Sequence, residues 1–169
     1  MTRLVLVRHA KAEAPRPGLD DHDRALTLDG RSSATALGTA LADAGVELGR
    51  VLVSSAVRTQ QTWRLMQSAF PHADAVTEPS LYETHVGGVI DLLRGLDSPN
   101  AIAIVGHEPT VSAAAAWLAG PGSDTKALQR IAHGLPTGTA ALMDFEGPLT
   151  GLDQHSAVLT AVCATHAHF

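Results

Sequence analysis

Two side chains able to do chemistry stand together near the start of the sequence. Arg8 and His9 follow directly after an apolar run, LVLV, at residues 4–7. Arginine presents a planar fork of N–H donors that suits phosphate or carboxylate groups, and histidine can act as a base, an acid, a ligand or a nucleophile. Taken alone, the pair is also compatible with the ordinary polar end of a buried strand.

The same order, an apolar run followed by polar or cationic side chains, occurs twice more. Residues 51–53 lead to Ser54 and Arg58, and residues 101–105 lead to His107. Arg58 would lie in the first turn of a helix, where the helix dipole disfavours a cation. A bound anion, held by Arg58 and by free backbone N–H groups, would explain that position. The alternative is a surface arginine.

The elements that carry these residues indicate an α/β protein. Short apolar runs alternate with helical patterns, which predicts a three-layer αβα sandwich with a mostly parallel central sheet. Further strands are expected at 73–76, 138–145 and 157–163, helices at 29–44, 56–69, 89–96 and 109–118, and irregular structure at 123–137. Ligands of such sheets bind at the carboxyl ends of the strands. If the three strands are neighbours, two arginines and two histidines meet there and form a phosphate clamp.

Composition narrows the class of protein. The 169 residues, 45% of them hydrophobic, suit a single domain over 1–169 with a sizeable core. A formal charge of -5, no basic run and only 4% aromatic residues argue against nucleic-acid binding. No apolar stretch is long enough to cross a membrane, and the N-terminal region lacks the pattern of a signal peptide. The lone Cys163 fits a reducing compartment, so a cytoplasmic location is expected.

A polar, turn-rich segment at 11–27 follows the first strand directly. Loops of this length in compact domains often carry function. We expect substrate specificity to reside here and in residues 120–137. Within the loop, Asp20 and Asp21 are interpreted as solvated connections.

Together, these segments resemble a known family. RHA at 8–10, SxxxRxxxT at 54–62 and GH at 106–107 look like the three signatures of the histidine phosphatase (phosphoglycerate mutase-like) superfamily. In RHAK at 8–11, Ala10 and Lys11 stand where the mutase branch commonly has Gly-x-Ser/Thr after the histidine. That sequence, the short chain and HDRxLxxxG at 22–30 resemble the small SixA-type branch, whose members are described as phosphohistidine phosphatases. The resemblance covers most of the chain, to about residue 145.

The resemblance implies a role for each matched residue. His9 would accept the phosphoryl group and form a covalent phosphohistidine, while Arg8, Arg58 and His107 would hold the phosphoryl oxygens. Phosphoryl transfer needs in-line positioning and stabilisation of charge on those oxygens, and arginine supplies permanent charge with bidentate geometry. No metal and no cofactor is implied, because the clamp would do the metal's task.

The proton donor is a separate question. Larger relatives carry an acid in a Leu-x-Glu segment, and Glu83 stands in such a segment at 81–83. Alcohol leaving groups need a positioned acid, whereas a protonated imidazole leaves readily. Lys11 is a candidate for attracting the substrate phosphate or for a solvated loop position, and His85 is an outside candidate for substrate contact. The remaining residues singled out are interpreted as structural or surface positions: His22, Arg24, Gly30, Thr62, His72, His133 and His155.

Three functions therefore stay open. The first is a metal-independent phosphatase acting through His9 on protein phosphohistidine or on a small phosphorylated compound. The second is a non-catalytic phosphate-binding or phosphoprotein-binding regulator on the same scaffold, against which the intact His9 counts. The third is a histidine-rich metal hydrolase, for which His166 and His168 offer the only suggestive spacing.

Overall fold

One mixed sheet organises the chain. The computed structural model describes residues 1–97 and 100–165, and within them the sheet has six strands in the order β3-β2-β4-β1-β5-β6. β3, β2, β4 and β1 run parallel to one another, β5 pairs antiparallel with β1, and β6 pairs antiparallel with β5. The strands are β1 (Thr2–Arg8), β2 (Arg50–Val53), β3 (Asp74–Thr77), β4 (Ala101–Gly106), β5 (Thr139–Phe145) and β6 (Val158–Cys163).

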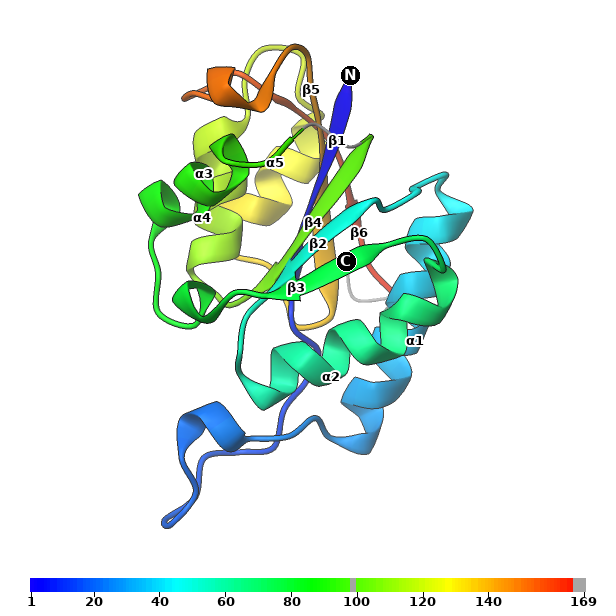
Figure 1. Cartoon of the computed structure of the whole chain (residues 1–169), viewed down its shortest axis with the longest axis vertical. Helices are drawn as coiled ribbons and strands as arrows, with labels where there is room; N and C mark the ends of the chain where they lie inside the picture. Colours follow the sequence, from blue (N-terminus) through cyan, green and yellow to red (C-terminus); the bar gives the residue numbers. More distant parts are fainter. Residues whose placement is uncertain (98–99, 166–169) are drawn as a thin grey trace.

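Helices cover both faces of this sheet, as the sequence predicts. α1 (Leu28–Asp43) and α2 (Val57–Met66) pack together on one face. α3 (Val86–Arg94), α4 (Thr110–Leu118) and α5 (Thr125–Ala132) lie on the other (Figure 1). The chain is therefore the three-layer α/β sandwich expected from the alternation of apolar runs and helical patterns.

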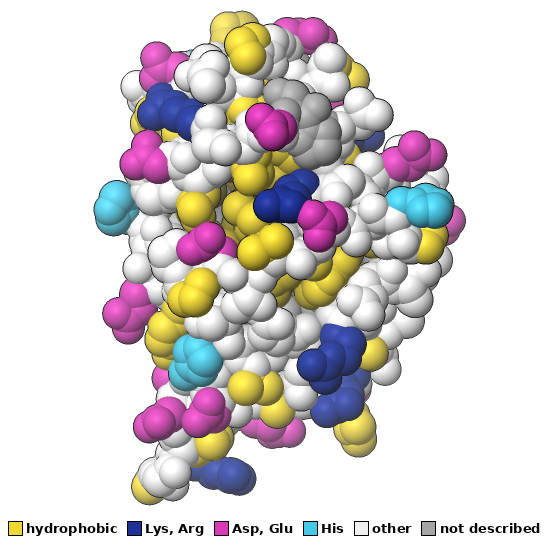
Figure 2. Space-filling model, in the orientation of Figure 1, with side chains coloured by type: hydrophobic (Ala, Val, Ile, Leu, Met, Phe, Trp, Pro, Cys, Tyr) yellow, Lys and Arg dark blue, Asp and Glu magenta, His cyan; other side chains and the backbone are white. Residues whose placement is uncertain are grey.

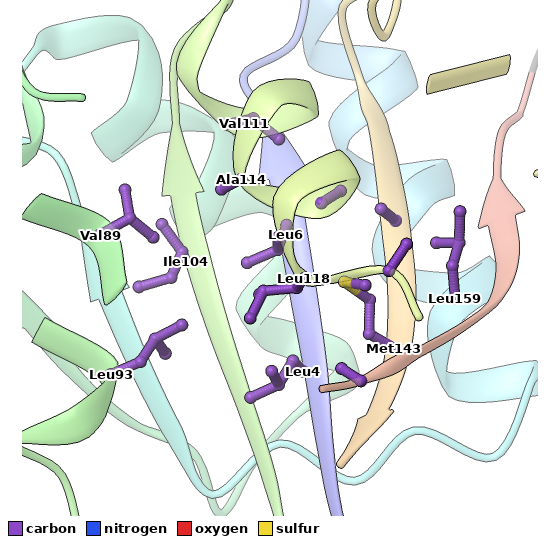
Figure 3. Close-up of a cluster of buried hydrophobic side chains, with 14 of the residues drawn as sticks. Leu4, Leu6, Val89, Leu93, Ile104, Val111, Ala114, Leu118, Met143 and Leu159 are labelled. Atoms are coloured by element: carbon purple, nitrogen blue, oxygen red, sulfur yellow. The ribbon is translucent and has the colours of Figure 1, made fainter. Parts of the chain in front are cut away.

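The core is divided by the sheet into two apolar clusters. Alternate residues of β1 supply both, since successive strand side chains point to opposite faces. Leu4 and Leu6 lie in the cluster that also holds Leu93 of α3 and Leu118 of α4 (Figure 3). Val5 belongs to the cluster under α1 and α2. A strand buried on both faces explains the unbroken apolar run at residues 4–7.

The strand order brings the three sequence motifs together. β4 lies between β1 and β2, with Arg8 opposite Gly106 and Val53 opposite Val105. The backbone N–H of His9 donates to the Gly106 carbonyl at 3.1 Å. The predicted convergence at the carboxyl edge of the sheet is therefore present in the backbone itself.

Several element boundaries differ from expectation. Residues 123–137 are not wholly irregular, because α5 occupies eight of them. Its cap is Asp124, whose carboxylate accepts from the Ala127 N–H, and Ala127 and Ile131 form its buried stripe. α3 begins earlier than predicted because the His85 ring accepts from the Gly88 N–H and caps the helix. α2 ends at Met66 and continues as the short 3-10 helix η2 (Gln67–Ala69).

The 11–27 loop projects from the lower end of the molecule in Figure 1 and is closed at its base. Ala12 and Leu26 form an isolated antiparallel bridge, and the Glu13 N–H donates to the Ala25 carbonyl at 2.8 Å. The loop contains a 3-10 helix, η1 (Asp21–Asp23). Acidic side chains are spread over the face shown in Figure 2, and at its lower end they lie among Lys and Arg side chains. Among the described residues, none of the helices is both long and apolar enough to cross a membrane.

Candidate active site

His9 lies directly beyond the end of β1, and a main-chain contact fixes its protonation. Its Nδ1 is 2.7 Å from the carbonyl oxygen of Ala10. A carbonyl can only accept, so Nδ1 carries the proton and Nε2 keeps its lone pair. The ring is buried, with 8% of the residue exposed. His9 is thus held in the tautomer that a nucleophile at Nε2 requires.

His107 faces His9 across the end of the sheet. The two ring centroids are 5.4 Å apart, and the His107 Nε2 is 2.8 Å from the hydroxyl of Ser54 at the end of β2. The opposite ring nitrogen, Nδ1, is buried without a hydrogen-bond partner among the described residues. Ser54 is itself fully buried, so the three strand ends combine into one polar cluster.

Arg8 and Arg58 are anchored in the same way. In each guanidinium, Nη1 donates to a main-chain carbonyl at 2.7 Å: Leu135 for Arg8 and Asp21 for Arg58. In each, Nε is buried and has no partner within the described part of the chain. The Nε–H and one Nη2–H of a guanidinium point the same way and form a bidentate pair suited to an oxyanion. In both arginines, the Nε–H of that pair has no protein partner among the described residues.

Asp21 corrects an expectation, because it is not merely a solvated loop residue. Its Oδ2 accepts from Arg58 Nη2 at 3.0 Å and from the Tyr82 hydroxyl at 2.6 Å. Its Oδ1 accepts from Arg24 Nε at 3.0 Å. These donors, led by the Tyr82 hydroxyl, hold the pKa of the Asp21 carboxyl well below its usual range. Asp20, by contrast, is exposed as expected.

Thr62 ties α2 to the strand that carries His9. Its hydroxyl accepts from the Ala10 N–H at 3.0 Å and donates to the Arg58 carbonyl at 2.7 Å. The Gly138 N–H, at the start of β5, donates to the His9 carbonyl at 2.9 Å. The backbone around His9 is therefore fixed from both sides, which agrees with the structural role predicted for Thr62.

Burial and positive charge keep both site histidines neutral. Desolvation is the main cause that lowers the pKa of His9 from 6.5 to about 3; the hydrogen bond to Ala10 opposes it, and His107, Arg58 and Arg8 add to it. Desolvation and Arg58 lower the pKa of His107 to about 4. Neutral rings at physiological pH leave the free ring nitrogens available to a substrate.

Glu83 lies beside the cluster. Its neighbour Tyr82 approaches the His107 ring edge-on, with centroids 5.7 Å apart, and the centre of the Arg58 guanidinium is 5.9 Å from the Tyr82 ring. The Glu83 side chain is exposed. Its charge acts on Tyr82, but no described contact joins the carboxylate to His9 or His107.

Lys11 and His85 do not join the cluster formed by Arg8, His9, Arg58 and His107. The Lys11 side chain is exposed on a hollow that Asp29, Ser32 and Thr137 also line. No contact among the described residues joins its ammonium group to His9. His85 is the N-cap of α3, which gives its ring a structural task.

His22 was interpreted as a surface or structural position, but its ring contacts residues at the edge of the site. Its Nε2 is 2.9 Å from the Ser55 hydroxyl, and its ring meets Tyr82 edge-on at 4.8 Å. Of the other histidines, His155 bonds to the Ala119 carbonyl, and His72 and His133 are exposed, as expected. His166 and His168 lie outside the described residues.

Sequence reasoning missed Asp21 and Tyr82 as parts of this cluster. The available signal for Asp21 was its spacing of three from Arg24, directly before the 22–30 segment that carries the SixA-type resemblance. For Tyr82 it was the place between the two matching residues of the Leu-x-Glu segment. Neither spacing indicates that the two side chains meet, because 61 residues separate them.

Comparison with known proteins agrees with this geometry. A model of the histidine phosphatase superfamily (branch 1) matches residues 4–93. An uncharacterized protein of Mycobacterium leprae is 35% identical over 92% of this chain and 97% of its own.

Two solved structures named SixA also match over almost their full lengths. The protein from Nakamurella multipartitia has 30% identity and a TM-score of 0.84, over 98% of this chain and 97% of its own. The protein from Agrobacterium tumefaciens has 28% identity and a TM-score of 0.82, over 97% of this chain and 98% of its own. The chain belongs to the histidine phosphatase superfamily, and within it to the SixA-type branch of phosphatases.

Proposed function

We propose that the protein is a metal-independent phosphatase that works through a covalent phosphohistidine on His9. The observation that carries the proposal is the hydrogen bond from Nδ1 of His9 to the Ala10 carbonyl, because it leaves Nε2 unprotonated in a neutral ring. The unpaired Nε–H groups of Arg8 and Arg58 and the unpaired Nδ1 of His107 supply groups to contact a phosphoryl oxygen.

In the first step, Nε2 of His9 attacks the phosphorus in line. The bond to the leaving oxygen or nitrogen breaks, and its electron pair goes to the leaving group. Arg8, Arg58 and His107 hold the equatorial oxygens, where negative charge lies in the transition state. A water then attacks the phosphorus and the P–Nε2 bond breaks, with its electron pair returning to Nε2. The protons of the water stay on the phosphate or pass to solvent, so inorganic phosphate departs and His9 is restored.

Glu83 is proposed as the proton donor for oxygen leaving groups. An alkoxide is a poor leaving group at neutral pH, so a nearby carboxylic acid accelerates its departure. A protonated imidazole needs no such help. Glu83 directly follows Tyr82, whose ring contacts His107, and this supports the assignment.

The positive charge of the site supports a reaction without a metal. Arg8 and Arg58 both act electrostatically on His9 and His107. Two guanidinium groups beside two neutral histidines disfavour a divalent cation and favour an anion. The clamp then stabilises charge where other phosphatases use metal ions.

The substrate is proposed to be protein phosphohistidine or a small phosphorylated compound. The SixA-named relatives are called phosphohistidine phosphatases, which supports the first class. Lys11, exposed two residues after His9, is proposed to attract the incoming phosphate. The lone Cys163 still favours the cytoplasm as the place of action.

The test compares two substrates in the presence of EDTA. Phosphoramidate and p-nitrophenyl phosphate are offered to the wild type, to His9→Ala and to His72→Ala. His72 is exposed, beside Gly49 and Asn100 at the other end of the sheet, so its variant is the matched control. We expect wild-type and control activity to survive EDTA, and His9→Ala to lose about a thousandfold or more.

Trapping the intermediate completes the experiment. A rapid alkaline quench followed by mass spectrometry should find one added phosphoryl group on His9. Activity lost with EDTA would indicate a metal hydrolase. Phosphate binding without turnover of either substrate would instead indicate the non-catalytic binder.

A further inference from the structure

The carboxylate of Asp21 sits at the end of the Arg58 guanidinium that faces the loop. The main-chain carbonyl of Asp21 accepts from Nη1 of Arg58, and the Asp21 carboxylate accepts from Nη2. The Arg58 side chain is 7% exposed, whereas that of Asp21 is 50% exposed. A buried arginine in the first turn of α2 is thus held by a residue of a surface loop.

The geometry leaves the binding side of Arg58 free. Asp21 occupies the end of the fork formed by Nη1 and Nη2. The perpendicular side, formed by Nε–H and the second Nη2–H, stays available, and Nε is buried without a partner among described residues. Asp21 therefore does not take the place of a phosphoryl group bound side-on.

Asp21 is itself firmly held. Arg24 donates to Oδ1 from Nε at 3.0 Å and from Nη2 at 2.9 Å, and also reaches the Glu13 carbonyl at 2.7 Å. The Tyr82 hydroxyl donates to Oδ2. Single exposed ion pairs contribute little, but a carboxylate shared by several fixed donors is far better ordered.

We propose that Asp21 is a positioning residue that orients Arg58 for phosphoryl binding and links it to the segment carrying Glu83. Through Arg58 it fixes the clamp, and through Tyr82 it fixes the neighbour of the proposed acid. The inference rests on the proposed function in taking Arg58 as a phosphoryl ligand and Glu83 as the acid, and the phosphate-binding tests depend only on the first.

The sign of the effect of Asp21→Asn on phosphate affinity tests this inference. Removing a negative charge beside an anion site should, by charge alone, tighten binding. If Asp21 orients Arg58, binding should weaken instead, by about tenfold, because misplacement of a binding group is costly. Titration calorimetry with inorganic phosphate measures the dissociation constant directly.

Asp20→Asn is the matched control. It makes the same change of charge one residue away, at an exposed side chain that makes no hydrogen bond in capping η1. We expect its dissociation constant to stay within about twofold of wild type. Tyr82→Phe, which removes one donor to Asp21 without changing net charge, should weaken binding by less than Asp21→Asn.

A double variant shows whether Asp21 acts through Arg58. In an Arg58→Ala background, Asp21→Asn should change the dissociation constant of phosphate by less than about twofold. An equal loss in both backgrounds, or tighter binding by Asp21→Asn alone, would overturn the proposal. Because phosphate binding is measured without turnover, a protein that binds but does not hydrolyse would refute the proposed function and leave this inference testable.

Discussion

Arg8 and Arg58 approach the site from different elements yet use their donors alike. Arg8 is the last residue of β1 and Arg58 lies in the first turn of α2. In each, Nη1 donates to a main-chain carbonyl, and Nε has no partner among the described residues. Arginine alone among the side chains has enough fixed donors to be anchored and still grip an oxyanion. Lysine at either position would keep the positive charge, but its single ammonium group could not bind the main-chain carbonyl and also present two fixed parallel donors to an oxyanion.

Glu83 gives a prediction that separates two kinds of leaving group. Glu83→Gln removes the proposed acid while keeping size and shape. Hydrolysis of alkyl phosphates should fall by about 10²-fold, the usual scale of general acid catalysis, and phosphoramidate hydrolysis should fall much less. Steady-state kinetics on both substrates, with Glu78→Gln as a control, decide the matter. Equal losses on both would remove Glu83 from the role of proton donor.

At the scale of elements, two glycines allow α1 to pack closely against the main chain of neighbouring segments. Gly30, in the first turn of α1, lies against the main chain of Lys11, and a Cβ there would overlap the Lys11 carbonyl. Gly38, two turns on, lies against Met66 of α2, where a Cβ would come within 2.9 Å of its backbone. Both glycines permit a close approach, but only the first touches the segment that follows His9.

We therefore predict different outcomes for two alanine substitutions. Gly30→Ala and Gly38→Ala should each lower the free energy of unfolding by about 1–3 kcal/mol, because overpacking displaces backbone. Only Gly30→Ala should also reduce turnover, since it pushes the chain next to the Ala10 carbonyl that holds His9. Urea unfolding and phosphatase assays on both variants check this. A Gly38→Ala enzyme that loses as much activity as Gly30→Ala would show that the effect is one of stability alone.

Elements also explain which features could be predicted from the sequence. The clamp could be predicted, because each of its motifs follows directly from an apolar strand and strand ends gather at one edge. α5 was missed because only Ala127 and Ile131 mark its buried face, between stretches rich in glycine and proline. The Asp21 contacts were missed because an irregular loop has no periodicity from which a partner on α2 could be inferred.

At the scale of the whole molecule, the neutral histidines make stability depend on pH. In the native state the pKa values are about 3 for His9 and about 4 for His107, both below the ordinary 6.5. As the pH falls below 6.5, the unfolded chain binds protons that the native chain cannot. Unfolding is therefore favoured progressively between about pH 6.5 and pH 4, and above that range the contribution of these groups is constant.

This dependence gives a measurable difference between variants. His107→Gln should flatten the fall of the unfolding free energy over that range, by at most about 1.4 kcal/mol per pH unit. Chemical denaturation at a series of pH values measures the slope. His72→Gln, which alters an exposed histidine, should leave the slope as in wild type. A His107→Gln slope equal to that of wild type would mean that His107 titrates normally in the native state.

The His9 ring is oriented by a main-chain carbonyl, and this affects which amino-acid substitutions can change its tautomer. In Ser-His-Asp triads a replaceable side chain orients the histidine, so a single substitution can reverse its tautomer. Here the orienting group is the carbonyl of Ala10, which every amino acid would supply. No exchange of a side chain can delete that acceptor. Mutation can displace this acceptor only by moving the main chain, so the tautomer of His9 is protected against most point mutations across the protein.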